Sequence, residues 1–145
     1  WRILPDGKSE VALDNIGTTN GIDLSMDEKT LYVGDSKSNK VFSYTVDDKK
    51  LTNEKLIIQF KDFEIDGLRT DVKGNIYVAR IGKGTIAKIT PDGTILQEIQ
   101  LHGKHPTNIA FGGPDGKTLF VTQRDGKFVE SFRVDIPGRE WQMKQ

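Results

Sequence analysis

The chain has 145 residues, of which 35% are hydrophobic, 29% charged and 8% aromatic, so it can bury one modest globular core. Its 21 Lys and Arg residues balance its 21 Asp and Glu residues, which argues against a partner that is a nucleic acid or an anionic membrane. The absence of cysteine excludes disulfides, thiolate zinc sites and cysteine nucleophiles. The composition does not distinguish a cytoplasmic from an exported protein.

Short strands are predicted along the whole chain. Residues 1–14 contain two of them around the turn Pro5-Asp6-Gly7. Further runs of β-branched and aromatic residues with alternating polarity follow, separated by turn-forming residues, at 40–46, 85–90, 95–101 and 128–134. No segment has the period of a helix. The sequence therefore predicts an all-β fold.

Three segments of the chain repeat one another. Residues 20–33 (NGIDLSMDEKTLYV), 66–78 (DGLRTDVKGNIYV) and 108–121 (NIAFGGPDGKTLFV) each hold a polar residue, an apolar strand, a turn and a second apolar strand. The period lies in the forties, and the Pro-Asp-Gly turn at Pro5 returns two periods later at Pro91. Two independent markers thus give one repeat length.

About four short strands in each repeat are typical of a β-propeller blade. We predict a partial blade at 1–14, blades at about 15–62 and 63–102, and a three-stranded blade at 103–138, or about three and a half blades of one domain. A β-sandwich with coincidental similarity is the alternative. Because a closed propeller needs about four to eight blades, we expect that an N-terminal half is missing or that a second copy of the chain closes the ring.

The repeats align Asn20, Asp66 and Asn108 at one position, directly before the first strand of successive blades. In a propeller that strand lines the central channel, so three amide or carboxylate oxygens would converge there. Such oxygens suit Ca²⁺ and can accept Mg²⁺ or Mn²⁺, whereas Zn²⁺ fits less well without His or Cys. Alternatively, each residue is a turn former that hydrogen-bonds its own backbone.

Two further residues are candidates by their position. His105 precedes Pro106 in the third repeat and is expected near the mouth of the channel, where it could relay protons or contact a substrate. An exposed loop histidine is the alternative. Asp35 follows a channel-side strand, and we expect it to order the next turn.

Three longer segments carry a family resemblance: TNGIDLSMDEKTLYVGDSKSNKVFSYTVD (19–47), DGLRTDVKGNIYVARIGKGTIAKITPDG (66–93) and HPTNIAFGGPDGKTLFVT (105–122). They resemble the second half of the gluconolactonase family, also called the senescence marker protein-30 or regucalcin family. The most specific matches are Asn20-Gly21, Asp66-Gly67 and the turn at 111–115. The resemblance implies a six-bladed propeller that holds one divalent metal at its axis and hydrolyses sugar lactones and related cyclic esters.

The resemblance also implies roles for individual residues. Asn20 and Asp66 would bind the metal, and Asp66 would be the candidate catalytic base. Asn108 matches no family ligand, so we assign it, with His105, to the substrate pocket. The family's remaining ligand, a glutamate of the first blade, has no counterpart in this sequence, nor do the arginine and asparagine that grip the substrate. A nearby cation would lower the pKa of Asp66 and weaken it as a base, which favours the ligand role.

The sequence thus predicts a metal-dependent hydrolase acting on a small lactone or related cyclic ester. Ca²⁺ is the best-matching ion, with Mg²⁺, Mn²⁺ and Zn²⁺ as alternatives. One alternative function is a non-catalytic propeller that binds a ligand or a protein, because the fold supports many functions. Another is a related synthase or a calcium-buffering protein. Neither nucleic acid nor membrane is an expected partner.

Overall fold

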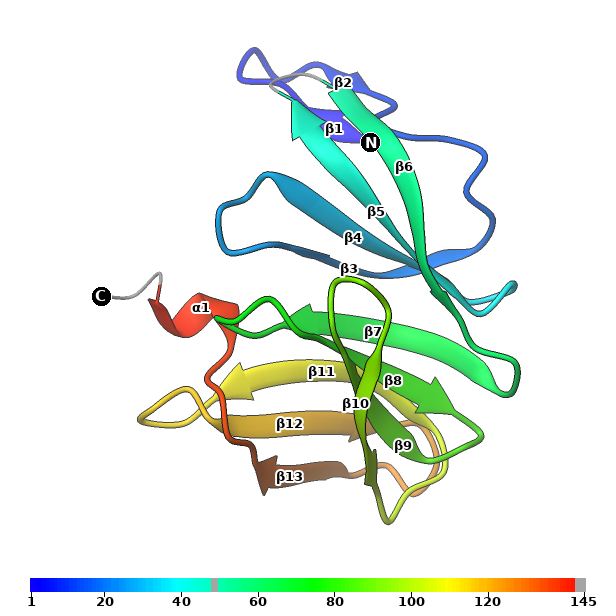
Figure 1. Ribbon diagram of the computed structural model, residues 1–145, viewed down its shortest axis with the longest axis vertical. Coiled ribbons are helices and arrows are strands. Elements are labelled where there is room, and N and C mark those ends of the chain that lie inside the picture. Colours follow the sequence, from blue (N-terminus) through cyan, green and yellow to red (C-terminus); the bar gives the residue numbers. More distant parts are fainter. Residues whose placement is uncertain (48–49, 143–145) are drawn as a thin grey trace.

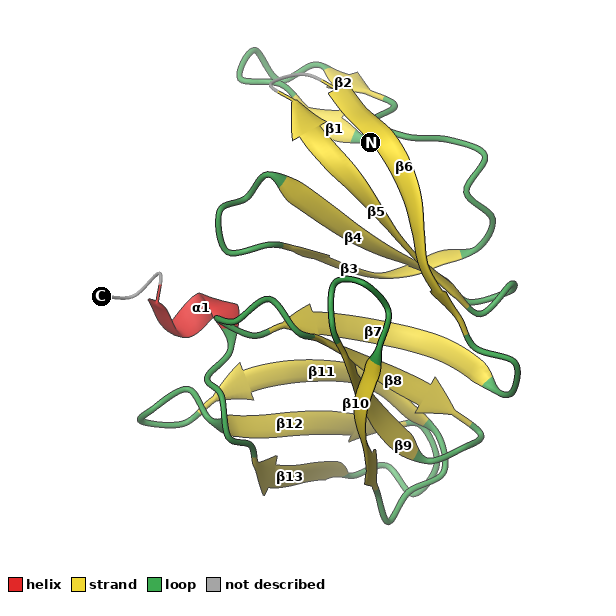
Figure 2. Ribbon diagram, in the orientation of Figure 1, coloured by secondary structure: helices red, strands yellow, loops and turns green. Residues whose placement is uncertain are grey.

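The computed structural model describes residues 1–47 and 50–142, which form antiparallel sheets and one short helix (Figures 1 and 2). The prediction of an all-β fold is confirmed. Each predicted run is a strand within about a residue of its expected ends, as β5, β9, β10 and β13 below. Within the described part of the chain no helix is long and apolar enough to cross a membrane.

The strands follow one another as neighbours in four sheets. An N-terminal pair joins β1 (Arg2–Ile3) to β2 (Ser9–Glu10). The first blade contains β3 (Thr19–Leu24), β4 (Thr30–Asp35), β5 (Lys40–Asp47) and β6 (Lys50–Gln59). The middle blade contains β7 (Glu64–Thr70), β8 (Ile76–Ile81), β9 (Thr85–Ile89) and β10 (Ile95–Gln100). The third blade contains β11 (Pro106–Gly112), β12 (Thr118–Gln123) and β13 (Val129–Arg133).

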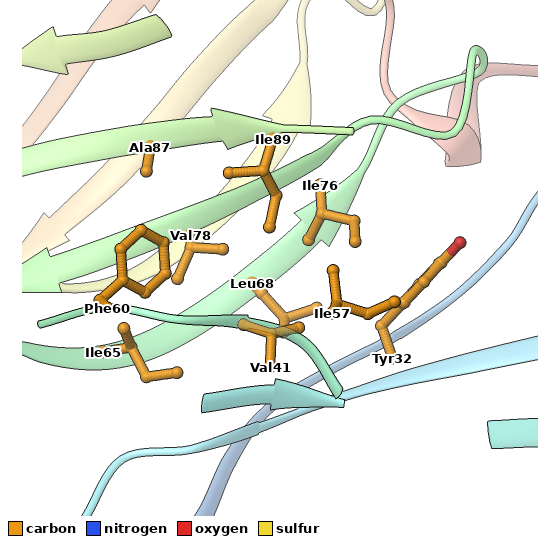
Figure 3. Close-up of a cluster of buried hydrophobic side chains, with 10 residues drawn as sticks. All are labelled: Tyr32, Val41, Ile57, Phe60, Ile65, Leu68, Ile76, Val78, Ala87 and Ile89. Carbon is orange, nitrogen blue, oxygen red and sulfur yellow. The ribbon is translucent and has the colours of Figure 1, made fainter. Parts of the chain in front are cut away.

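The core lies between the blades because alternate side chains of a strand face opposite sides of its sheet. In β8, Ile76 and Val78 pack toward the first blade, while Tyr77 and Ala79 pack toward the third. Figure 3 shows the first of these two clusters, which also contains side chains from β4 to β9. The middle blade therefore has apolar neighbours on both faces.

The C-terminal segment contacts the residues that follow β3 and β7. Helix α1 (Arg139–Gln142) follows a bridge between Gly138 and Asp71 of the middle blade. Buried Arg139 donates from Nε to the Ser25 carbonyl at 3.1 Å and forms an ion pair with Glu28 in the same turn of the first blade. This segment therefore links the first and middle blades at the end of β7 and β3.

Candidate functional site

Strands β3, β7 and β11 are the first strands of their sheets and lie side by side, β3 against β7 and β7 against β11 (Figure 1). The register of β3 with β4 shifts between Thr19 and Ile22, and that of β7 with β8 shifts between Ile65 and Leu68. Asn20-Gly21 and Asp66-Gly67 are the residues inside these two bulges. A bulge redirects the side chains it carries, so the two blades use the same device at the same place.

Glycine follows each of the two polar residues because the backbones approach closely there. A Cβ on Gly21 would lie 2.6 Å from the Asp66 carbonyl oxygen and 2.6 Å from the Leu68 nitrogen. A Cβ on Gly67 would lie 2.5 Å from Asn108 Oδ1. The absence of a side chain thus lets the three inner strands meet at the level of the predicted site.

The Asp66 carboxylate is half-buried beside Asn20. Burial raises the pKa of Asp66 above its usual range, and the nearby Glu64 carboxylate adds to the rise. A side-chain hydrogen bond from Asn20 and the positive charge of Arg124 oppose it. The Asp66 carboxylate has lost part of its hydration, and the Asn20 amide beside it has an oxygen of its own. Carboxylate and amide oxygens are hard donors that suit a divalent cation.

Asn108 is displaced by one position from the predicted alignment. Ile22, Leu68 and Ile109 pair with the equivalent valines Val33, Val78 and Val121. Thr107, rather than Asn108, therefore matches Asn20 and Asp66, and Asn108 matches the glycines. Its Oδ1 accepts a hydrogen bond from the Ile109 nitrogen at 2.9 Å while lying against Gly67. Asn108 thus contacts the site from the third blade, with its carbonyl oxygen already occupied by its own strand.

His105 lies at the same end of the inner strands. Its side chain is 28% exposed, and its Nδ1 contacts the Asp125 carboxylate. It lines a cavity of about 400 Å³ together with Phe63, Glu64, Ile81, Gly82 and Arg124. Nothing in the sequence pattern singled out Arg124 or Phe63, since both are in loops. Arg124 directly follows β12, the second strand of the third blade.

Asp35 has the turn-ordering role that its position predicted. Its Oδ1 accepts hydrogen bonds from the backbone nitrogens of Thr18 at 2.9 Å and Lys37 at 3.2 Å. The Ser38 hydroxyl donates to the other carboxylate oxygen. Asp35 therefore fixes the loop that leads into Asn20.

The described residues contain no large cluster of acidic or histidine side chains. Over 1–47 and 50–142, no three or more His, Cys, Asp or Glu side chains lie close enough together to hold an ion. Asn20 and Asp66 are two oxygen donors whose chemistry fits a hard divalent cation.

The sequence profile of the SMP-30/gluconolactonase/LRE-like region matches residues 1–124. The chain belongs to this family. It is 34% identical over 132 residues to regucalcin from Bos taurus, covering 87% of this chain and 44% of that protein. It is 28% identical over 154 residues to 6-deoxy-6-sulfogluconolactonase from Pseudomonas putida, covering 94% of this chain and 53% of the relative.

The fold agrees with solved structures of the same family. Regucalcin from Agrobacterium tumefaciens, described as a calcium-binding protein, superposes with a TM-score of 0.82 at 26% identity, covering 91% of this chain and 51% of that one. The predicted partial β-propeller is therefore confirmed. The chain spans about half the length of the curated relatives it matches.

Proposed function

We propose that this chain provides the Asn20–Asp66 half of a metal-dependent lactonase site that opens sugar lactones or related cyclic esters. The observation that carries the proposal is the placement of these two oxygen donors in matching bulges of adjacent inner strands. The similarity to a protein named 6-deoxy-6-sulfogluconolactonase supports the reaction class. The similarity to a regucalcin described as calcium-binding supports Ca²⁺ as the ion.

Asn20 and Asp66 would hold the ion, and blades outside this chain, from further sequence or from a second copy, would complete its ligands. When bound, a divalent ion polarises an ester carbonyl and stabilises the negative charge that develops on its oxygen. The hydrogen bond from the Asn20 side chain favours the charged form of Asp66, which is the form that binds a cation.

Asp66 also has the position of a proton acceptor. Burial favours its neutral form, which matches a group that takes a proton from water in the transition state. A bound cation acts in the opposite direction by favouring the carboxylate. We therefore assign Asp66 first to holding the ion and second to receiving the proton.

The test is pH-stat hydrolysis of a panel of small lactones by the purified protein with Ca²⁺, Mg²⁺, Mn²⁺ or Zn²⁺ and with a chelator. Asp92 is an exposed turn carboxylate on the β9–β10 hairpin, so Asp92→Asn is a charge-matched control for Asp66→Asn. We expect chelation and Asp66→Asn each to reduce turnover by at least about 100-fold, because the ion supplies several kcal/mol of charge stabilisation. Asp92→Asn should leave turnover unchanged.

Two results would contradict the proposal. Turnover that survives both chelation and Asp66→Asn would place the reaction elsewhere. Metal binding that depends on Asp66, without hydrolysis of any lactone by a protein in which the completing blades are present, would instead identify a non-catalytic, ion-binding propeller.

A further inference from the structure

A pocket next to Asp66 has features that the metal site does not use. This pocket, which we call the mouth pocket, is the cavity of about 400 Å³ between the middle and third blades. Glu64 and His105 enter it from the residues that begin β7 and precede β11, the end of the inner strands that carries Asp66. Charges on Glu64 and Arg124 both act on the Asp66 carboxylate. The mouth pocket and Asp66 are therefore parts of one electrostatic environment.

Arg124 offers the pocket an accessible cation. Its side chain is 61% exposed, and its Nε lies 3.6 Å from Asp125 Oδ1. Its backbone nitrogen donates to the His105 carbonyl at 3.0 Å, which fixes the base of the side chain. Neither Nη atom donates a hydrogen bond to any residue that the structure describes. A guanidinium with free donors is the side chain best suited to a carboxylate, because it can bind both oxygens at once.

Phe63 gives the same pocket an exposed aromatic face. Phe63 is 50% exposed. Its ring packs on Gly82, where an added Cβ would lie 3.0 Å from Phe63 Cδ1. Its φ of 49° is in the left-handed region, which is unusual for a bulky residue. Backbone strain of this kind is concentrated at ligand-binding sites. A flat apolar ring in this position can cover the C–H face of a carbon chain.

His105 and Glu64 add groups that can bind hydroxyls. His105 Nδ1 lies against the Asp125 carboxylate, and Nε2 has no partner among residues 1–47 and 50–142. The Glu64 carboxylate accepts hydrogen bonds but repels anions, and the Asp125 carboxylate lies beside Arg124 Nε. An anionic group would therefore bind at the two Nη atoms of Arg124, away from both carboxylates. The pocket thus combines one cation, one aromatic face and two hydroxyl-binding groups.

We propose that the mouth pocket binds polyhydroxy carboxylates, with Arg124 on the carboxylate, Phe63 over the carbon chain, and His105 and Glu64 on the hydroxyls. This inference rests on the proposed function, since a polyhydroxy carboxylate is what hydrolysis of a sugar lactone releases. The lactone is neutral and its product is an anion, so Arg124 distinguishes the two. Arg124 is thereby a product-binding residue of the site.

The test compares gluconate with glucitol, which has the same carbon chain but no carboxylate, by titration calorimetry and by amide chemical shifts. The proteins are the parent, Arg124→Gln, Phe63→Leu and the control Arg133→Gln. Arg133 is similarly exposed, at 57%, but pairs with Asp115 at the opposite end of β12. We expect the parent to bind gluconate about tenfold more tightly than glucitol, which is the typical effect of one charge-assisted hydrogen bond.

Arg124→Gln should remove this preference, Phe63→Leu should weaken both ligands to a similar extent, and Arg133→Gln should change neither. Equal affinity of the parent for gluconate and glucitol would overturn the proposal, as would identical behaviour of Arg124→Gln and Arg133→Gln. Because binding is measured without turnover, the two proposals can fail separately. Gluconate that binds to a protein without lactonase activity contradicts only the catalytic function, and turnover without preference for gluconate contradicts only the role of Arg124.

Discussion

The middle and third blades share one sequence repeat but differ in what covers them. Strand β8 of the middle blade is buried on both faces, whereas in β12 of the third blade buried and exposed residues alternate. Tyr77 and Phe120 occupy the same place in the repeat, yet Tyr77 is 0% exposed and Phe120 is 40% exposed. The difference arises because Tyr77 packs in the cluster between the middle and third blades, whereas Phe120 faces the other side of its sheet and belongs to neither buried cluster.

The same contrast applies at the inner strands. Gly67 of the middle blade lies against the backbone of the third blade, while Asn108, its equivalent, carries a side chain. A repeat position therefore requires a particular residue only where another blade packs on it.

Tyr77→Ala should destabilise the protein by about 3 to 5 kcal/mol, the usual cost of truncating a fully buried aromatic residue. The substitution removes a ring that meets Phe111 edge-on at a centroid distance of 5.1 Å between the two blades. Urea unfolding followed by circular dichroism measures the change. A loss below about 1 kcal/mol would show that the middle and third blades are not packed together in solution.

Gly67→Ala should cost about 1 to 3 kcal/mol, since the new methyl group overlaps backbone and side-chain atoms of Asn108. The matched control is Gly34→Ala in β4, where the nearest atom, Ile65 Cδ1, is 3.4 Å from the added Cβ. The control should change the free energy of unfolding by no more than about 0.5 kcal/mol. Equal effects of the two substitutions would contradict the close approach of β7 and β11.

Glu130 of the third blade makes a pH-dependent contribution to the stability of the folded protein. Burial alone would raise the pKa of Glu130, but hydrogen bonds from the backbone nitrogens of His102 at 2.9 Å and Gly103 at 2.8 Å outweigh it and hold the pKa below its usual range. This stabilisation is present above the pKa of the unfolded chain and is lost as the pH falls through the lowered folded pKa.

Glu130→Gln should therefore cost about 1 to 3 kcal/mol at neutral pH. The difference from the parent should shrink as both proteins are unfolded at progressively lower pH through the carboxyl range. A difference that stays constant with pH would show that the charge of Glu130 makes no contribution.

Phe120→Ser should have the smallest effect, within about 0.5 kcal/mol, because Phe120 is partly exposed on the outer face of the third blade. Thermal unfolding of parent and variant at several concentrations measures it. A large or concentration-dependent loss of stability would mean that this face is covered in solution.

The sequence predicted the strands and the repeat because a half-buried strand leaves a direct pattern of alternating residues. It also predicted that Asn20 and Asp66 lie together, because both occupy the same position in the repeat. It misaligned Asn108 because the hairpin between Ile109 and Val121 is one residue longer than that between Ile22 and Val33. Sequence alignment cannot distinguish an extra residue in a turn from one in a bulge.

The mouth pocket was predicted only at His105. Phe63 and Glu64 are adjacent in the chain, but Arg124 comes from a distant segment, and no spacing rule connects it to them. Their association depends on how the middle and third blades pack, which single-residue patterns do not encode. The unusual φ of Phe63 is likewise visible only in the structure.

The central claim is that Asn20 and Asp66 together hold a divalent ion, and calorimetric titration of the protein with Ca²⁺ tests it most directly. We expect one ion per chain in the parent and in Asp92→Asn, and no binding, or greatly weakened binding, in Asp66→Asn and Asn20→Ala. Undiminished Ca²⁺ binding by Asp66→Asn, or a parent protein that binds none of Ca²⁺, Mg²⁺, Mn²⁺ and Zn²⁺, would contradict it.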